Sequence, residues 1–132
     1  MPLPPLLSEY PPALRVVFAV VLPLAAGFAT GLTLGASATL WAIANIIVFF
    51  GGIAAGFDHD GAVAGAKRGV LGGLLFGCAL VLADAVAVDH RVARIADPPV
   101  LHPLITMTIG TIFGALGGAL RARVMRHRAA PA

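Results

Sequence analysis

The feature that most constrains this chain is a row of glycines at every fourth position from residue 61 to residue 77. The row consists of Gly61, Gly65, Gly69, Gly73 and Gly77. Glycine inside a water-exposed helix costs roughly 1 kcal/mol relative to alanine, so five at this spacing would weaken a soluble helix. In a bilayer the same spacing is favourable, because helices associate there where small residues let two backbones approach closely. The row therefore predicts one helix of a tightly packed membrane bundle.

Such a row winds around its helix, because each four-residue step moves the stripe by about 40° and the whole row covers roughly 160° of the helix surface. One parallel neighbour cannot cover so wide a stripe. We expect either a partner that crosses at the right-handed angle typical of GxxxG pairs, or two different helices packed along the stripe.

The composition also favours a membrane location. The chain has 132 residues, of which 59% are hydrophobic and 11% charged, and its mean hydropathy is +0.95. A soluble domain of this size could not bury so many apolar side chains. The net charge of +3 comes from basic residues that cluster at the ends of apolar segments, which is typical of orientation signals in membrane proteins. We expect a lipid bilayer as the surroundings and no nucleic-acid partner.

Four apolar segments are long enough to cross the hydrocarbon layer, which takes about 20 helical residues. The predicted helices are residues 14–34, 38–57, 62–88 and 100–120. The fold class is thus all-α, a polytopic membrane protein whose transmembrane domain is residues 14–122. A proline-rich interfacial arm, residues 1–13, precedes it, and a basic tail, residues 123–132, follows. Pro23 removes a hydrogen bond and is expected to kink the first helix, either as a hinge or as a static packing feature.

Small residues recur along all four predicted helices, and we expect the four to pack through GxxxG ladders. The glycines predicted to pack helix against helix are Gly27, Gly31, Gly52, Gly65, Gly69, Gly73, Gly77, Gly110, Gly114 and Gly118.

The basic residues predict the orientation. Four spans place both termini and the loop after the second helix on one side, and that side holds seven of the nine basic residues: Arg15, Lys67, Arg68, Arg121, Arg123, Arg126 and Arg128. The positive-inside rule then makes both termini cytoplasmic, in a bacterial inner membrane. Lys67 and Arg68 are expected to snorkel to this surface. The basic tail could also attract anionic lipid, although topology anchoring is sufficient to explain it.

Asp84 is the most informative polar residue. It lies seven residues after Gly77 and 11 after Gly73, which places it within about 20° of both on a helix. An ionisable side chain that faces a bundle inside the membrane is a functional-site hypothesis by default. We expect Asp84 and His102, with Thr106 below them and Arg91 or Arg94 nearby, to form a polar vestibule open to the outside. The alternative is that Asp84 pairs with Arg91 as a structural tie.

Asn45 lies deep in the second predicted helix and shares a face with Gly52 and Gly56. It is expected to point inward, either to make an interhelical hydrogen bond or to line a pathway. The pathway candidates are therefore Asn45, Asp84, His102 and Thr106.

The sequence offers little for catalysis. No HExxH pattern, phosphate loop or Ser-His-Asp order is recognisable. The turn Asp58-His59-Asp60 has side chains suited to a divalent cation, but three adjacent turn residues fit a solvated helix cap better. The lone Cys78 lies in an apolar run and is expected to be a small buried hydrophobic residue. We expect no enzyme, no cofactor and no metal site.

Residues 15 to about 80 resemble the N-terminal helices of the aromatic acid exporter and fusaric acid resistance family of permeases. The matching pieces are Arg15, Trp41-Ala42, and Ala66-Lys67-Arg68-Gly69 followed by Gly72, Gly73 and Gly77. The chain differs from that family in having four predicted spans and no cytosolic domain. The run of residues 51–56 looks equally like small four-helix bacterial membrane proteins of unknown function. The first resemblance implies export of small organic anions.

Together these features predict a homo-oligomer that forms a transport or channel-type pathway for a small solute. Four short helices enclose little space, so the pathway is expected to need more than one subunit or a seam between subunits. The alternative is a non-transporting structural or accessory subunit that docks partners through its glycine ladders.

Overall fold

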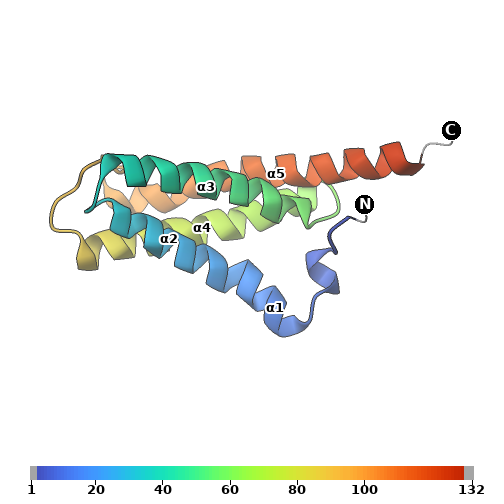
Figure 1. Ribbon diagram of the computed structural model, residues 1–132, viewed down its shortest axis with the longest axis horizontal. Coiled ribbons are helices and arrows are strands. Elements are labelled where there is room, and N and C mark those ends of the chain that lie inside the picture. The colour runs from blue at the N-terminus through green and yellow to red at the C-terminus, as the bar shows by residue number, and fades with distance from the viewer. Residues whose placement is uncertain (1–2, 130–132) are drawn as a thin grey trace.

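The computed structural model describes residues 3–129, and their regular structure is helical. Four helices in this part of the chain are long and apolar enough to cross a membrane: Pro12–Thr33, Ala38–Phe57, Ala62–Ala87 and Pro99–Ala129. The prediction of an all-helical chain with four candidate spans is confirmed. We call the end that holds residues 3–11, 58–61 and 121–129 the termini end, and the end that holds residues 34–37 and 88–98 the loop end (Figure 1).

The first candidate span is built from three pieces, which are α1 (Pro12–Val16), the π-helix η2 (Val17–Val21) and α2 (Leu22–Thr33). It begins at Pro12, two residues before the predicted start, because proline at the first helical position loses no hydrogen bond. Before it, Leu7–Glu9 of the proline-rich arm form a short 3-10 helix, η1. The Leu7 amide donates to the Asp58 carbonyl at 2.9 Å, which ties this arm to the loop that follows α3.

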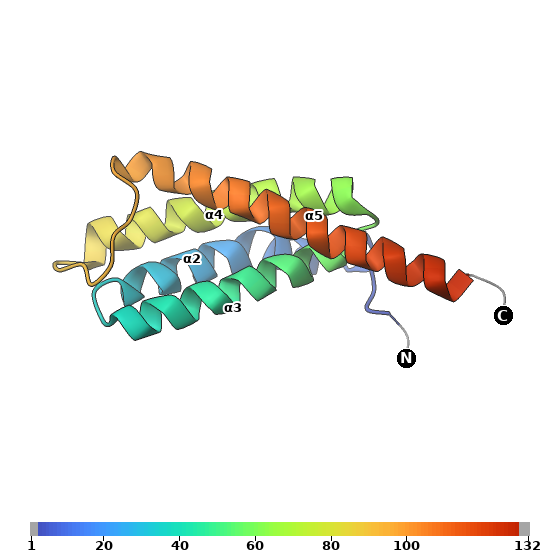
Figure 2. The same cartoon turned by 90° about the horizontal axis from the view of Figure 1, so that it is seen from above.

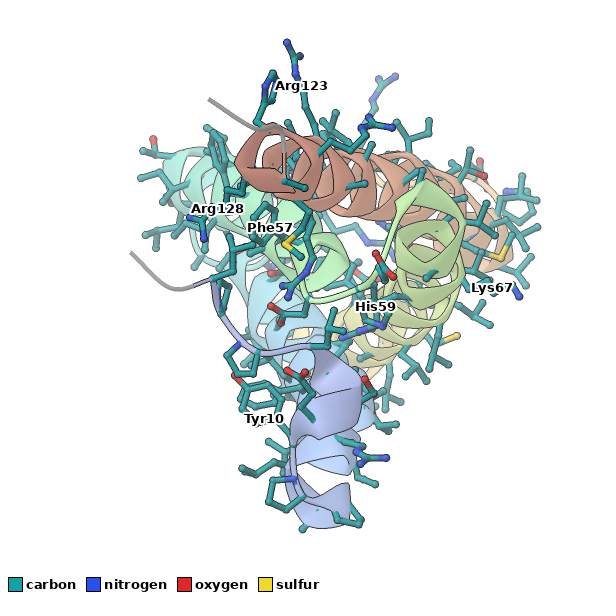
Figure 3. All side chains as sticks on the ribbon, turned by 90° about the vertical axis from the view of Figure 1, so that its right-hand side faces the viewer. Tyr10, Phe57, His59, Lys67, Arg123 and Arg128 are labelled. Carbon is teal, nitrogen blue, oxygen red and sulfur yellow. The ribbon has the colours of Figure 1, made fainter. Side chains whose placement is uncertain are left out.

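The π turn lies directly before Pro23. The Leu22 amide donates to the Val17 carbonyl, five residues earlier, and the next residue, Pro23, has no amide hydrogen to donate. π turns and prolines both bend helices. The α1 end of this span slopes away from the other helices, as both the side view and the end view show (Figures 1 and 3). The expected disturbance at Pro23 is thus present as a π turn that precedes the proline.

The second and third candidate spans are the single helices α3 (Ala38–Phe57) and α4 (Ala62–Ala87). The hydroxyl of Ser37 accepts the Leu40 amide at 3.0 Å and so caps the N-terminus of α3. Gly61 has a φ of 87° in the turn before α4, a conformation that favours glycine. After the loop of residues 88–98, the 3-10 turn η3 (Pro99–Leu101) leads into α5 (His102–Ala129).

The last helix is longer than the sequence predicted. It was expected to end at about residue 120 and to be followed by a basic tail, but α5 continues to Ala129 and extends past the other helices (Figures 1 and 2). The physical reason is that residues 119–129 are mostly good helix formers, with no glycine or proline among them. The rest of the predicted tail, residues 130–132, lies outside the described residues.

The helices α4 and α5 form the central antiparallel pair, and α5 crosses α4 obliquely (Figure 2). The glycine row of α4 faces α5 along its whole length. A β-carbon built at Gly65 or Gly69 would overlap the carbonyl oxygen of Gly114 or Gly110, respectively. At the ends of the row, Gly77 faces Pro103 and Gly61 faces Gly118.

The other two spans also approach their neighbours at glycines. On the α2 side, a β-carbon at Gly27 would overlap the Phe76 carbonyl oxygen of α4, and one at Gly31 would lie 2.7 Å from the Leu80 oxygen. On the α3 side, a β-carbon at Gly56 would overlap the carbonyl oxygen of Gly114. Gly114 therefore lies where the backbones of α3, α4 and α5 meet.

Large buried side chains are concentrated towards the loop end. Leu34 and Leu80 are fully buried and pack with Phe76, and Trp41 and Val48 pack against this cluster. Many other apolar side chains point outward, especially on α3, and such exposure is expected where the surroundings are lipid.

Candidate functional site

Two of the four predicted pathway residues, Asn45 and Thr106, line a cavity between the four candidate spans. The cavity has a volume of about 290 Å³. Its wall is mostly apolar, and among the residues that line it Arg68 alone is charged. The rings of Phe49 and Phe113 stack at 5.3 Å along the α3–α5 side. A largely apolar cavity with a few polar groups is the usual form of a small-molecule site.

Glycines from three helices contribute to the wall of this cavity, among them Gly52 of α3, Gly72 of α4 and Gly110 of α5. A β-carbon at Gly52 would touch only the Phe113 side chain, at 3.5 Å. The space at position 72 is taken by the Arg68 side chain, whose Nη1 would lie 2.7 Å from a β-carbon there.

Arg68 enters the cavity instead of snorkelling to the surface, so the expectation for this residue was wrong. Its Nη2 donates to the Phe18 carbonyl at 2.5 Å, while its neighbour Lys67 points away from the bundle (Figure 3). The reason lies in the first span. The Leu22 amide is engaged with Val17, and Pro23 has no amide hydrogen, so the helix itself cannot satisfy the Phe18 carbonyl. Arg68 supplies the missing donor.

Asn45 and Thr106 also differ in what they bind. The Asn45 amide nitrogen donates to the Trp41 carbonyl of its own helix at 2.8 Å, where an interhelical bond was one of the two expectations. The Thr106 hydroxyl lies 2.8 Å from the Gly73 carbonyl of α4, within hydrogen-bonding distance. The polar link between helices at this level is therefore made by Thr106.

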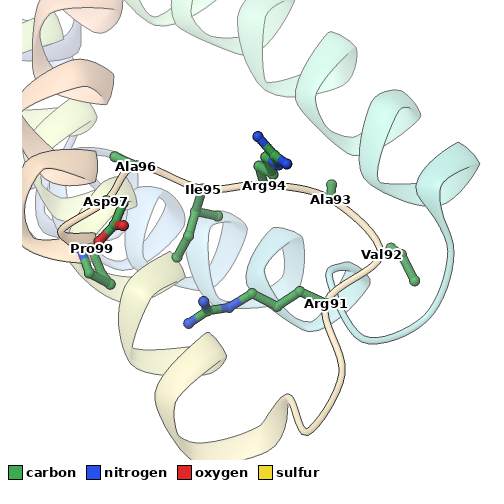
Figure 4. Close-up of a pocket in the computed structure, with 8 residues that line it drawn as sticks. All are labelled: Arg91, Val92, Ala93, Arg94, Ile95, Ala96, Asp97 and Pro99. Atoms are coloured by element: carbon green, nitrogen blue, oxygen red, sulfur yellow. The ribbon is translucent and has the colours of Figure 1, made fainter.

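Asp84 pairs with Arg91 at the loop end. Asp84 is 4% exposed, and its carboxylate accepts two hydrogen bonds from the Arg91 guanidinium, Nε to Oδ1 at 2.6 Å and Nη2 to Oδ2. These bonds raise the pKa of Arg91 above its usual value. Arg91 reaches to α4 from a loop that surrounds an open hollow of about 680 Å³ (Figure 4). The geometry is that of the structural tie, which was the alternative to an Asp84 vestibule.

His102 begins α5 at the same end. Its Nδ1 is buried and has no hydrogen-bond partner within residues 3–129. The structure gives it no hydrogen bond to Asp84, whose recorded partner is Arg91. The four predicted residues thus fall in two places, with Asn45 and Thr106 at the cavity and Asp84 and His102 at the loop end.

The termini end is held by a buried arginine that the sequence did not distinguish from the rest of the basic tail. Arg121 is 7% exposed and donates from Nη1 to the carbonyls of Pro4, at 2.9 Å, and Phe57, at 3.1 Å. Its guanidinium also lies over the Phe57 ring, 5.8 Å from the centroid. The arm, the end of α3 and α5 are therefore joined at one side chain.

The turn Asp58-His59-Asp60 lies beside Arg121. Burial raises the pKa of Asp58, and the neighbouring charges of His59, Arg121 and Arg68 oppose that rise. The His59 Nδ1 lies 3.1 Å from the Ala55 carbonyl of α3. Within the described part of the chain, no three His, Cys, Asp or Glu side chains are grouped so as to hold a metal ion.

Arg68 was missed as a site residue, although two sequence signals were present. Gly72 follows it by one helical turn, which leaves room for a long side chain to fold inward, and Pro23 creates an unpaired carbonyl on another span. The fact that these two features face each other could not be read from the sequence.

No protein-family model, curated protein or solved structure matches this chain. Function is therefore inferred from the geometry of the molecule itself, and the resemblance of residues 15–80 to exporter permeases stays a prediction.

Proposed function

We propose that this chain is a small integral membrane protein that forms a transport or channel-type pathway for a small solute. The observation that supports this most is the cavity between the four apolar helices, to which Asn45, Thr106 and Arg68 contribute polar groups. Polar side chains are costly within a bilayer, and they commonly mark the path of a solute.

The pathway that we propose is closed towards the loop end. Leu34 and Leu80 are fully buried there and pack with Phe76, which also lines the cavity. Asp84 and His102 lie at the loop end, so they would form a second polar station. A solute would pass from one station to the other when the packing of α2 against α4 loosens.

Orientation and assembly belong to the same proposal. We propose that both termini lie in the cytoplasm of a bacterium, because four basic residues lie at the termini end and two at the loop end, and positive charge favours the inner side. The glycine contacts are proposed to hold the bundle together in lipid as GxxxG ladders. A homo-oligomer would form through the outer faces, since the glycine row of α4 is covered by α5 of the same chain.

A flux assay with a cavity-filling variant tests the pathway. Purified protein in liposomes is expected to release at least one solute from a panel of ions, organic anions and neutral polar molecules. Gly52→Leu should reduce this flux at least tenfold, because the new side chain enters the cavity, whereas Ala54→Leu, at an exposed position on α3, should not. Folded protein that gives no flux for any solute would contradict the pathway and favour the non-transporting accessory subunit.

A further inference from the structure

Arg68 carries its charge into an apolar cavity, where its hydrogen-bond partner is neutral and the charge of Asp58 lies nearby but outside ion-pair distance. Within residues 3–129 its guanidinium has one recorded hydrogen bond, to the Phe18 carbonyl, and no carboxylate at ion-pair distance. A guanidinium has five N–H donors in a planar fork that matches a carboxylate. The Asp84–Arg91 pair of this chain has that two-bond geometry. Arg68 has donors left over for an anion.

The guanidinium lies in space that Gly72 leaves free. Its Nη1 would lie 2.7 Å from a β-carbon at Gly72, and the Pro23 ring is 3.9 Å from the same point. Arg68, Gly72 and Pro23 all belong to the cavity wall. The charged head therefore lies at the cavity.

The present partner of Arg68 can be replaced. The Phe18 carbonyl is a neutral acceptor, and a hydrogen bond to an ionised acceptor is roughly twice as strong as one between neutral groups. In an apolar cavity an unpaired charge is also costly. A carboxylate that enters the cavity would therefore bind the guanidinium in preference to the carbonyl.

The rest of the cavity wall determines the polarity and size of the ligand. Most lining side chains are apolar, including Phe49, Phe76 and Phe113. A volume of about 290 Å³ lies just below the range of about 300–1,000 Å³ that is usual for ligand pockets, so the cavity suits a small ligand. Octanoate is such a ligand, whereas a whole phospholipid is much too large.

We propose that the cavity is a binding site for small amphipathic carboxylates, with Arg68 on the carboxylate and the apolar wall around the hydrocarbon body. This site gives the chemical class of the solute for the proposed pathway. Its physiological meaning rests on that pathway. Binding at equilibrium does not itself require transport, so the two can be tested separately.

The test is calorimetric titration of the full chain in phosphatidylcholine nanodiscs with octanoate and with its neutral isostere octanamide, after subtraction of empty discs. Octanoate is expected to bind wild-type protein at least tenfold more tightly than octanamide. Arg68→Gln should abolish this preference and Arg68→Lys should keep part of it. The matched control Lys67→Gln removes an adjacent charge that points outward, and it should leave the preference unchanged.

A second variant keeps the test decisive should Arg68→Gln fail to fold. Gly52→Leu retains Arg68 but fills the apolar part of the cavity, and it is expected to weaken octanoate binding at least tenfold. Equal binding of octanoate and octanamide by wild-type protein, or octanoate binding unchanged in either variant, would overturn the site. Octanoate binding that disappears in phosphatidylglycerol discs would also overturn it, since a lipid headgroup would then be the occupant.

The outcome also separates this site from the pathway. Tight octanoate binding without flux of any solute would contradict transport and leave the carboxylate site standing. Flux of solutes by a protein that binds octanoate and octanamide equally would support transport and contradict the carboxylate site.

Discussion

At the scale of single residues, the polar groups inside the bundle lie in two places, at the loop end and at the cavity. At the loop end, two hydrogen bonds between the buried Asp84 and the exposed Arg91 join the end of α4 to the loop that follows it. Removal of one partner from such a pair leaves a buried charge without compensation, which is worse than removal of both.

A double-mutant cycle should show this coupling. Arg91→Gln is expected to lower the thermal unfolding midpoint by several degrees, and by more than Asp84→Asn, because it leaves the Asp84 carboxylate buried and unpaired. The double variant should be more stable than Arg91→Gln alone. Thermal unfolding in nanodiscs measures all four proteins, and strictly additive shifts would contradict the buried tie.

Asp58 should make stability depend on pH. Burial raises its pKa above the ordinary value of 3.8, so the folded state holds this proton more tightly than the unfolded state. The stability from this group is full below about pH 3.8 and is lost as the pH rises through the raised folded value. Asp58→Asn is therefore expected to flatten the pH dependence of the unfolding midpoint just above pH 3.8. A profile for Asp58→Asn that matches the wild-type profile would contradict the prediction.

The sequence identified which polar residues lie inside spans, but not what they bind. Asn45 and Thr106 were found from their polarity in apolar runs, and both line the cavity. Each side chain binds a backbone carbonyl, and the sequence does not show which carbonyl lies within its reach. The direction of Arg68, in particular, is set by a carbonyl that a π turn and a proline leave unpaired on another helix.

At the scale of elements, the helices approach one another closely through backbone at their glycines. The clearest case is Gly114, whose carbonyl oxygen would be overlapped by a β-carbon at either Gly56 or Gly65. A β-carbon at Gly114 itself would overlap the Gly65 oxygen. Backbone atoms cannot rotate away as a flexible side chain can, so the helices would have to separate.

Gly114→Ala is therefore expected to destabilise the bundle by about 1–3 kcal/mol or more, as is typical of overpacking. Gly51→Ala is the matched control, because a β-carbon at Gly51 would meet nothing within 4 Å. The fraction folded, measured against increasing denaturant in mild detergent, should fall early for Gly114→Ala and stay at the wild-type curve for Gly51→Ala. A wild-type curve for Gly114→Ala would show that the close approach is not essential.

Helix positions were easier to predict than helix ends and irregularities. The second span was predicted at residues 38–57 and is found at Ala38–Phe57, because Ser37 and Asp58 are clear polar boundaries. The last helix continues to Ala129, since no residue before the end of the described chain stops it. The π turn at Val17–Val21 had no signal except the nearby Pro23.

At the scale of the whole molecule, the bundle has two chemically different ends. The termini end carries Arg121, Arg123, Arg126 and Arg128, and Arg91 and Arg94 lie in the loop of the other end. The four apolar helices were predictable because hydrophobic length is a property of the sequence itself. The cavity was not, because it depends on how four helices tilt around glycines.

The orientation can be measured by cysteine labelling in a background with Cys78→Ala. Ser8→Cys at the termini end and His90→Cys at the loop end are both at exposed positions. In intact bacterial cells, a membrane-impermeant maleimide is expected to label only the cysteine at position 90, because positive charge keeps the termini end inside. Labelling at position 8 alone would contradict this orientation and indicate the opposite one.

The fixed pairing of α4 with α5, from Gly61 opposite Gly118 to Gly77 opposite Pro103, restricts how such a chain can change length during evolution. One residue inserted into either helix would rotate every later glycine away from its counterpart by about 100°. Residues inserted between 88 and 98 would leave all these pairs aligned. Descendants of this chain should therefore accumulate insertions and deletions in that connection, while the segments on either side keep a constant length.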